Sequence, residues 1–153
     1  MVSVADDTSN FAGGTATTGT VVLFKGIGDG TFGLPLALAT TSTPTSLAVG
    51  DIDLNGMTDF VVGERTGVEV FRGNSFTPSP TRVFLPSASA NPILSVSFGR
   101  LNGDSFTDIV AAHRSLNPTT PAEVEIFITD PASSQYLPSS TIINTAGTIG
   151  FDF

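Results

Sequence analysis

The sequence predicts an all-β protein built from β-propeller blades of four antiparallel strands, with about three blades' worth of chain. Short runs rich in Val, Ile, Leu and Phe alternate with clusters of Gly, Pro, Ser, Thr and Asn, which is the pattern of strands and turns. Apolar residues hold no helical period over a useful length. The strand pattern also repeats along the chain, and a β-sandwich would not need such a repeat.

Twelve short segments have the composition of strands, and turn-forming residues separate each from the next. In chain order they are 2–5, 21–25, 34–39, 46–49, 59–63, 68–72, 82–85, 94–98, 108–112, 123–128, 141–144 and 148–153. They group into a partial blade, two blades of four strands and the start of another blade. The corresponding units are 1–40, 45–86, 93–145 and 147–153.

The two complete units repeat each other in sequence. The stretch "SLAVGDIDLNGMTDFVVG" aligns without a gap on "LSVSFGRLNGDSFTDIVA". Arg100 follows Asp51 by 49 residues, and Asp152 follows Arg100 by 52 residues. A period near 50 residues with about four strands per period is typical of a propeller blade. Asp152 would then be the first residue of a further loop of the same kind.

Composition narrows the classes of function. The chain has 153 residues, of which 40% are hydrophobic and 13% charged, as expected for one packed domain. Its net charge of −8 favours cations and disfavours nucleic acid and anionic membranes as partners. Cysteine is absent, which excludes disulfides and thiolate sites. No apolar run approaches the roughly 20 residues of a membrane span, and residues 1–10 lack the pattern of a signal peptide.

A family resemblance follows from these motifs. The stretch "VVLFKGIGDGTFGLPLALATTSTPTSLAVGDIDLNGMTDFVVG" resembles the FG-GAP, or VCBS, repeat of integrin alpha-subunit propellers and many secreted bacterial proteins. The motifs that carry the likeness are the hairpin turn "GDGTF" and the loop "DxDxNGxxD" before an apolar strand. The resemblance implies a propeller fold and a calcium loop. It says little about biological role, because one fold serves many functions.

The loop after residue 50 fits a calcium ion. Calcium takes six to eight oxygen ligands at about 2.3–2.6 Å, and a loop that curls around the ion offers oxygens from alternate positions. Gly56 allows the sharp turn. The expected ligands are Asp51, Asp53, Asn55, the backbone carbonyl of Met57, and Asp59. An EF-hand is excluded because its twelfth position holds Val62 instead of Glu. An alternative is that these Asp and Asn side chains only cap backbone amides, as they do in many turns.

The second loop, "GRLNGDSFTD", departs from this pattern. Arg100 stands in the first ligand position, and Ser105 replaces the glycine. A weaker, degenerate site would use Asn102, Asp104, the carbonyl of Phe106, and Asp108. We expect the guanidinium of Arg100 to pair with Asp104 or Asp108 in place of an ion. The alternative is that Arg100 points outward and leaves a weakened metal site.

The sequence favours a binding module over an enzyme. His113 is the only histidine and is expected at the end of a strand; no P-loop or GxSxG motif is present. We expect a non-catalytic, calcium-binding, extracellular or secreted propeller module for adhesion, recognition of a protein or carbohydrate ligand, or cell-surface assembly. The alternative is the propeller portion of a secreted hydrolase or lyase with its catalytic residues elsewhere. Further blades are expected from a parent chain, another copy or a partner subunit.

Overall fold

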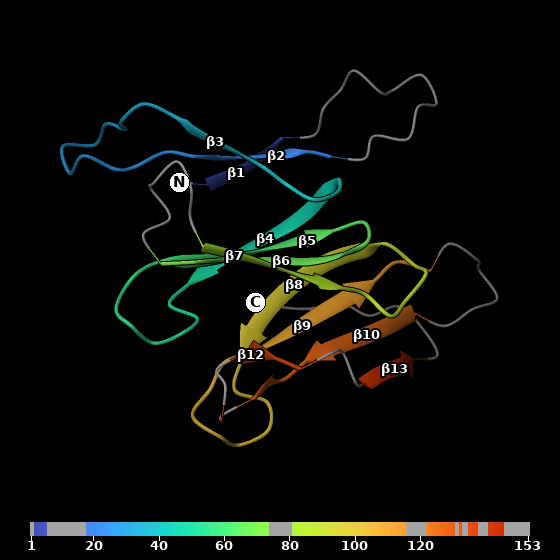
Figure 1. Ribbon diagram of the computed structural model, residues 1–153. Helices are drawn as coiled ribbons and strands as arrows, with labels where there is room; N and C mark the ends of the chain where they lie inside the picture. The colour runs from blue at the N-terminus through green and yellow to red at the C-terminus, as the bar shows by residue number, and fades with distance from the viewer. Residues whose placement is uncertain are drawn as a thin grey trace, which may run out of the picture.

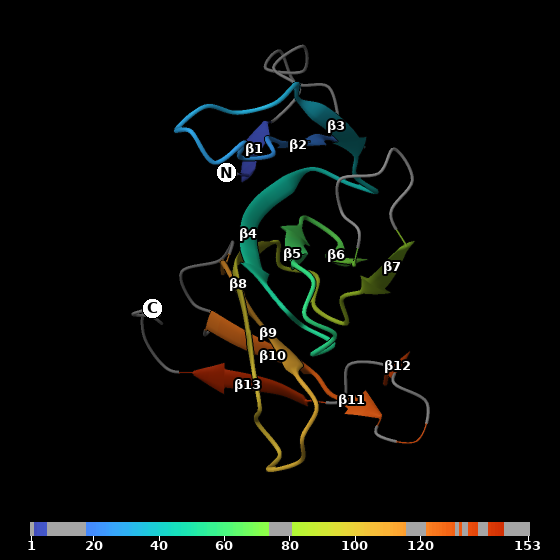
Figure 2. The ribbon, with the colours of Figure 1, turned by 90° about the vertical axis from the view of Figure 1, so that its left-hand side faces the viewer.

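The computed structural model describes residues 2–5, 18–73, 81–115, 122–130, 132, 135–137 and 141–145. Throughout this described part of the chain the regular secondary structure is β-strand, and no helix occurs. The strands form three antiparallel sheets that lie one above another, with a short additional hairpin beside the last sheet (Figures 1 and 2). The predicted all-β class and the antiparallel blades are therefore confirmed.

The first sheet has three strands in the order β1-β2-β3. They are β1 (Val2–Ala5), β2 (Thr20–Leu23) and β3 (Leu36–Ala39). A long hairpin joins β2 to β3, and an isolated bridge pairs Gly26 with Phe32. At its tip the carboxylate of Asp29 accepts hydrogen bonds from the backbone N–H of Thr31 at 2.9 Å and from its hydroxyl at 2.6 Å. The predicted "GDGTF" hairpin turn is therefore present.

The next two sheets have four strands each, and we call them the second and third blades. The second blade has the order β4-β5-β6-β7, with β4 (Pro44–Gly50), β5 (Asp59–Glu64), β6 (Gly67–Arg72) and β7 (Thr81–Pro86). The third blade has the order β8-β9-β10-β13, with β8 (Ile93–Gly99), β9 (Asp108–His113), β10 (Ala122–Phe127) and β13 (Thr141–Thr145). Between β10 and β13 lies a small hairpin of β11 (Thr129–Asp130) and β12 (Gln135–Tyr136).

The two blades share one register. Gly50 pairs with Asp59 in the second blade, and Gly99 pairs with Asp108 in the third. Each first strand also has a register shift near its start, between Pro44 and Ser46 and between Ile93 and Ser95. The repeat in the sequence is therefore a repeat of backbone geometry, and residues 49 apart in these strands occupy equivalent places.

The second blade is buried on both faces. One face, with Phe60, Val62 and Phe71, packs on apolar side chains of the first sheet. The opposite face, with Val61 and Val70, packs on the third blade. Phe60 and Phe71 stack at 4.5 Å between ring centroids. Burial on both faces explains why the middle of β5, "FVVG", contains no polar residues in alternation with the apolar ones.

The strand boundaries differ little from those predicted. Most observed strands begin or end within one or two residues of the predicted segment, which is the usual uncertainty at strand ends. The β11–β12 hairpin was not predicted, because its strands have only two residues each. The predicted strand at 148–153 lies outside the described residues. The described sheets stack as an arc and do not close into a ring (Figure 2).

Candidate metal centre

The loop between β4 and β5 brings three carboxylates together. One oxygen each from Asp51, Asp53 and Asp59 lies within 4.8 Å of the others. Asp53 is exposed, Asp51 is half-buried and Asp59 is fully buried, so the cluster runs from the surface into the end of the blade. Charges of the same sign at this separation repel by about 1 kcal/mol per pair even in water.

The side chains of this loop also bind its own backbone. The carboxylate of Asp51 accepts hydrogen bonds from the N–H groups of Asn55 at 3.0 Å and Gly56 at 2.8 Å. Asp53 accepts a longer bond of 3.3 Å from the same Asn55 N–H, and the Asn55 side-chain oxygen accepts one from Met57 N–H at 2.7 Å. The capping alternative from the sequence is thus realised here. Each carboxylate oxygen has two lone pairs, so capping leaves it able to ligate an ion as well.

Two left-handed residues curl the loop. Gly56 has a φ of 84°, in agreement with the sharp turn predicted there. Leu54 has a φ of 59° and is the only described residue other than glycine with a positive φ. A leucine in this region is strained, because its Cβ approaches the following carbonyl oxygen. The loop therefore holds its three carboxylates together at some conformational cost.

Asp59 anchors the loop to the blade. Its Oδ2 accepts hydrogen bonds from the N–H groups of Ile52 at 2.9 Å and Asp53 at 3.3 Å. Its Oδ1 accepts a short hydrogen bond from the N–H of Gly73, which follows β6. One buried carboxylate thus ties the start of the loop to the end of the third strand of the blade.

The second loop lacks a comparable cluster: in the described part of the chain, the only group of three potential metal-binding acidic, His or Cys side chains is the one at Asp51. Here Asp104 accepts hydrogen bonds from the N–H of Phe106 at 2.8 Å and from the side-chain amide of Asn102 at 2.8 Å. Asp108 repeats the anchor of Asp59, accepting from Leu101 N–H at 3.0 Å and Thr129 N–H at 2.9 Å. In the second loop the neutral side-chain amide of Asn102 therefore contacts the carboxylate of Asp104, where the first loop has a third carboxylate nearby.

The predicted ion pair of Arg100 is not formed. Among the described residues Arg100 makes no ion pair with Asp104 or Asp108, and it is exposed. The oxygens of both aspartates accept hydrogen bonds from nearby amides. An exposed pair would add little to stability while restricting a long side chain. Arg100 is therefore exposed to solvent, as in the alternative in which its side chain points outward.

The two loops also differ in where glycine lies. Gly103, with a φ of 81°, occupies the place of Leu54, so the same left-handed position is unstrained in the second loop. Ser105 occupies the place of Gly56 and does not have a positive φ. The second loop therefore keeps the first left-handed position and has lost the second.

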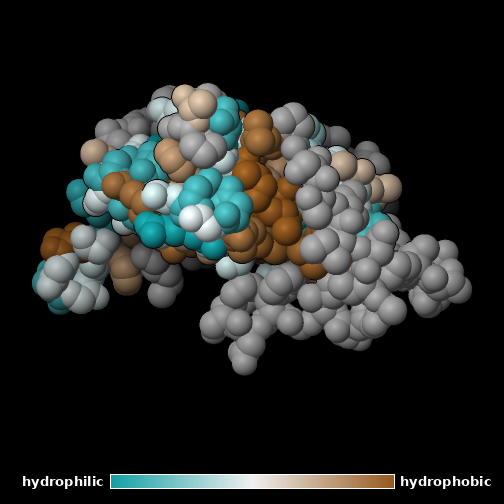
Figure 3. Space-filling model, turned by 90° about the horizontal axis from the view of Figure 1, so that it is seen from below, coloured by the Kyte–Doolittle hydropathy of each residue, from teal (hydrophilic) through white to brown (hydrophobic). Residues whose placement is uncertain are grey.

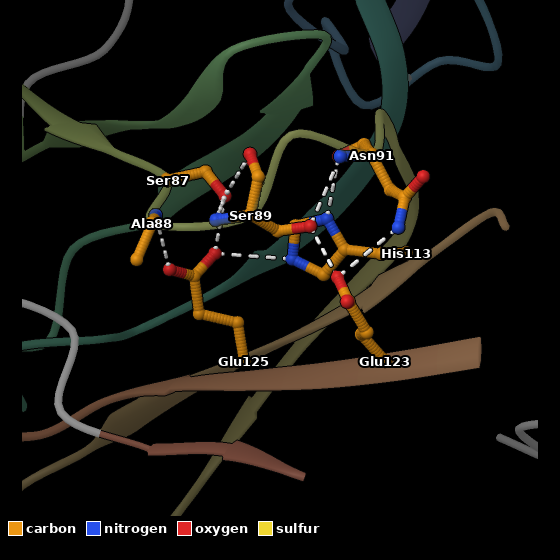
Figure 4. A network of polar contacts seen from close by, with 7 residues as sticks. All are labelled: Ser87, Ala88, Ser89, Asn91, His113, Glu123 and Glu125. Atoms are coloured by element: carbon orange, nitrogen blue, oxygen red, sulfur yellow. Dashed lines mark hydrogen bonds and ion pairs between the residues drawn. The ribbon is translucent and has the colours of Figure 1, made fainter. Parts of the chain in front are cut away.

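A buried ionic cluster in the third blade was not predicted from the sequence (Figure 4). The Nε2 atom of His113 lies 3.0 Å from Oε2 of Glu125, and both side chains are completely buried. The Nδ1 atom lies 2.8 Å from the carbonyl oxygen of Asn91. Glu125 also accepts hydrogen bonds from the N–H of Ala88 and the hydroxyl of Ser87, each at 2.7 Å.

Burial disfavours the charged imidazole of His113. The hydrogen bonds to Glu125 and to the Asn91 carbonyl, with the negative charges of Glu125 and Glu123, outweigh burial and raise the pKa of His113 above its ordinary value of 6.5. His113 ends β9, as expected, but its partner was missed. A signal existed: the Glu residues of "AEVEIF" alternate with apolar residues on a strand that is buried on one side.

Comparison of the chain with known proteins gives one family match. Residues 51–111 match the model of the FG-GAP-like repeat. No curated protein and no solved structure matches the chain. In the described residues, no helix has the length and apolar character to cross a membrane.

The matched range follows the architecture closely. It begins at Asp51, the first residue of the carboxylate cluster, and ends at Ala111 in β9, so it contains both loops and part of the core between the two blades. The "DxDxNGxxD" motif, the antiparallel blades and this match agree with one another. The chain therefore carries an FG-GAP-like repeat over residues 51–111.

Proposed function

We propose that this chain is a calcium-binding, non-catalytic propeller module. The observation that supports it most is the set of three carboxylates from Asp51, Asp53 and Asp59, whose oxygens lie within 4.8 Å of one another in a loop of an FG-GAP-like repeat. Hard oxygen donors of this kind suit calcium, which accepts six to eight of them in flexible geometry. The side-chain oxygen of Asn55 and the carbonyl of Met57 complete the proposed ligand set.

Calcium would act as a structural ion in this loop. It removes the repulsion among the three carboxylates and offsets the strain at Leu54. Because Asp59 also binds the N–H of Gly73, an ion held by Asp59 links the loop to the end of β6. The proposed role of the ion is therefore to order one edge of the second blade.

The second loop is proposed as a weak site at most. Asn102, Asp104, Asp108 and the carbonyl of Phe106 are its potential ligands, with one carboxylate fewer than the first loop. Asn102 already gives its amide to Asp104 at 2.8 Å. An ion there would have to displace this bond, so we expect only the first loop to bind calcium at micromolar to submillimolar concentrations, the range of many sensor and extracellular sites.

Recognition of a protein or carbohydrate ligand outside the cell is the proposed biological role, in adhesion or cell-surface assembly. The net charge of −8 favours cations such as calcium, which agrees with this setting. The alternative is the propeller portion of a secreted hydrolase or lyase. Ser87 gives its hydrogen bond to Glu125 and not to the histidine, so this serine is not activated by His113.

Calcium titration tests the proposal. In isothermal titration calorimetry of chelator-treated protein, we expect one site, and Asp53→Ala should abolish it. Asp104→Ala is the matched control in the second loop and should leave the titration unchanged. Calcium at 100 times its Kd should add about 2.7 kcal/mol to the unfolding free energy. Equal melting curves with and without calcium would contradict the proposal.

The outer face of the third blade supports a second proposal, that a further blade packs there. Val110, Val124 and Ile126 are half-buried and alternate with residues that face the second blade. Their equivalents in the second blade, Val61, Val68 and Val70, form the core shared with the third blade. Figure 3 shows an apolar area in the middle of the molecule's underside, where the third blade lies.

Such a face favours association with another apolar sheet, from the parent chain, a second copy or a partner subunit. Sedimentation velocity of the 153-residue chain should therefore show concentration-dependent self-association. Ile126→Lys on the outer face should reduce it, whereas Leu94→Lys, at an exposed site in β8, serves as the control for added charge. A compact monomer at all concentrations would contradict this second proposal.

A further inference from the structure

The second blade contains two glutamates inside its packed face. Glu64, at the end of β5, has 0% of its surface exposed, and Glu69, in β6, has 1%. Glu64 pairs with Gly67 and Val62 pairs with Glu69, so the two glutamates are diagonal neighbours on one face of the sheet. Long side chains at diagonal positions are within reach of each other. This face packs on the first sheet, because Phe60 and Phe71 point the same way.

Both carboxyl groups hold the connection between the first sheet and the second blade. Glu64 accepts a hydrogen bond from the N–H of Ser42. Glu69 accepts bonds from the N–H of Thr41 at 3.1 Å and from its hydroxyl at 3.2 Å. Thr41 and Ser42 lie between β3 and β4. Any change in the charge of these two glutamates therefore acts directly on this connection.

Positive charge reaches only one of the two glutamates. The Nη1 atom of Arg82, on β7, lies 3.4 Å from Oε1 of Glu69, and 51% of the arginine side chain is exposed. In the described part of the chain Glu64 has no ion pair, and its Oε1 is buried without a hydrogen-bond partner. The neighbouring strand β4 and the residues between β3 and β4 contain no charged side chain, and Arg65 is exposed in the turn after β5.

The third blade has an equivalent site in which a histidine, and not a second acid, lies beside the glutamate. His113 pairs with Glu123 and Ala111 pairs with Glu125, so His113 and Glu125 occupy the same diagonal as Glu64 and Glu69. There the two side chains lie 3.0 Å apart and form an ion pair when His113 is protonated. Glu125 holds the connection between the second and third blades through the N–H of Ala88, as Glu69 holds the preceding connection. One blade has a histidine opposite the glutamate, and the other has a second acid.

We propose that Glu64 is a proton-binding site: it keeps its proton beside Glu69 at neutral pH, and loss of that proton at higher pH loosens the connection between the first sheet and the second blade. In the third blade the positive charge of protonated His113 balances Glu125, and in the second blade the proton removes the negative charge of Glu64. The charged groups around Glu64 are Glu69 from β6 and, beyond it, Arg82 from β7. Two unprotonated carboxylates here would repel each other in a site that excludes water.

The pKa of Glu64 agrees with the proposal that this side chain keeps its proton. Burial, the largest cause, and the neighbouring Glu69 raise the pKa of Glu64 from 4.5 to about 8, against the opposing effect of the Ser42 N–H. The folded pKa lies above the unfolded one. The protonated group therefore contributes stability that is fully present below pH 4.5 and is lost as the pH rises through about 8. His113 contributes in the same direction, so the two groups must be separated by substitution.

The direct test is the titration of Glu64 by NMR with ¹³C-labelled glutamate carboxyl groups, in protein treated with a chelator. We expect one resonance with a midpoint near 8, and we expect Glu64→Gln to remove it. Glu69→Gln should lower that midpoint, because it removes the neighbouring charge. A midpoint at the ordinary value of 4.5 would overturn the proposal, and this result needs only the wild-type protein.

The second test is amide hydrogen exchange at Thr41 and Ser42 between pH 6 and 9. After correction for intrinsic rates, we expect protection to fall about tenfold in the wild type and to stay constant in Glu64→Gln, whose side-chain oxygen can still accept from Ser42. His113→Gln is the control and should leave this change at Thr41 and Ser42 intact. Equal loss of protection in the wild type and in Glu64→Gln would overturn the link between the proton and the connection.

Discussion

The second and third blades have one backbone and two different electrostatic designs. Each places a polar loop after its first strand and a pair of ionisable side chains on a diagonal between its second and third strands. The second blade fills both places with acids, at Asp51 and at Glu64. The third blade places Arg100 and His113 there instead. Under the two proposals made above, an ion in the loop and a proton on Glu64 supply the balancing positive charge in the second blade.

The comparison teaches that register fixes where polar groups meet, while single residues decide what neutralises them. The anchors are common to both blades: Asp59 and Asp108 each accept hydrogen bonds from N–H groups at the start of the loop and from one N–H beyond the third strand. Buried backbone N–H groups need hydrogen-bond partners, and this requirement is the same in both copies. The groups that differ between the copies, Asp51 against Arg100 and Glu64 against His113, are not fixed by this shared requirement. The differing residues are therefore the best candidates for function.

The largest effect is expected from breaking the ion pair of the third blade. Glu125→Ala leaves His113 and the N–H of Ala88 buried without their partner, which should cost about 3–5 kcal/mol. Glu123→Ala is the matched control, since Glu123 is only half-buried, and should cost about 1 kcal/mol. Urea unfolding measures both. Equal costs would show that the pair contributes no more than a surface contact.

A smaller and equal effect is expected at the two anchors. Asp59→Asn and Asp108→Asn each weaken hydrogen bonds from buried backbone N–H groups, so each should lower the unfolding free energy by about 2–3 kcal/mol without calcium. Adding calcium should widen the difference between wild type and Asp59→Asn, because only Asp59 belongs to the proposed metal centre. For Asp108→Asn, the difference should stay the same. If calcium changes the unfolding free energy of both variants by the same amount as that of the wild type, the two loops do not differ as proposed.

Much of this architecture could be predicted from the sequence. The repeat of "DFVVG" and "DIVAA" predicted strands with equivalent places, and the loop motif placed three carboxylates within one short segment. Such predictions succeed because they depend on local spacing, which the sequence displays directly.

The remaining features depend on contacts between distant segments. Glu69 meets Thr41 and Glu125 meets Ala88 only because neighbouring sheets stack, and no local pattern encodes which turn lies above which strand. The hydrogen bond from the Asn102 side-chain amide to Asp104 likewise becomes known only from the folded loop. The charged residues inside apolar strands indicated that something polar lay buried, but not what it would bind.

The smallest expected effect concerns the left-handed position shared by the two loops. Leu54 adopts a φ of 59° and is 53% exposed, so replacing it loses little apolar burial. Leu54→Gly relieves the strain but adds freedom to the unfolded chain, and the net gain in unfolding free energy should be about 0.5 kcal/mol. The reverse change, Gly103→Ala, meets no atom within 4 Å and should cost about 1 kcal/mol through backbone strain alone. Thermal unfolding with chelator measures both. Opposite signs would establish that the second loop is the relaxed version of the first, whereas a loss of stability in Leu54→Gly would mean that the leucine side chain contributes contacts that outweigh its strain.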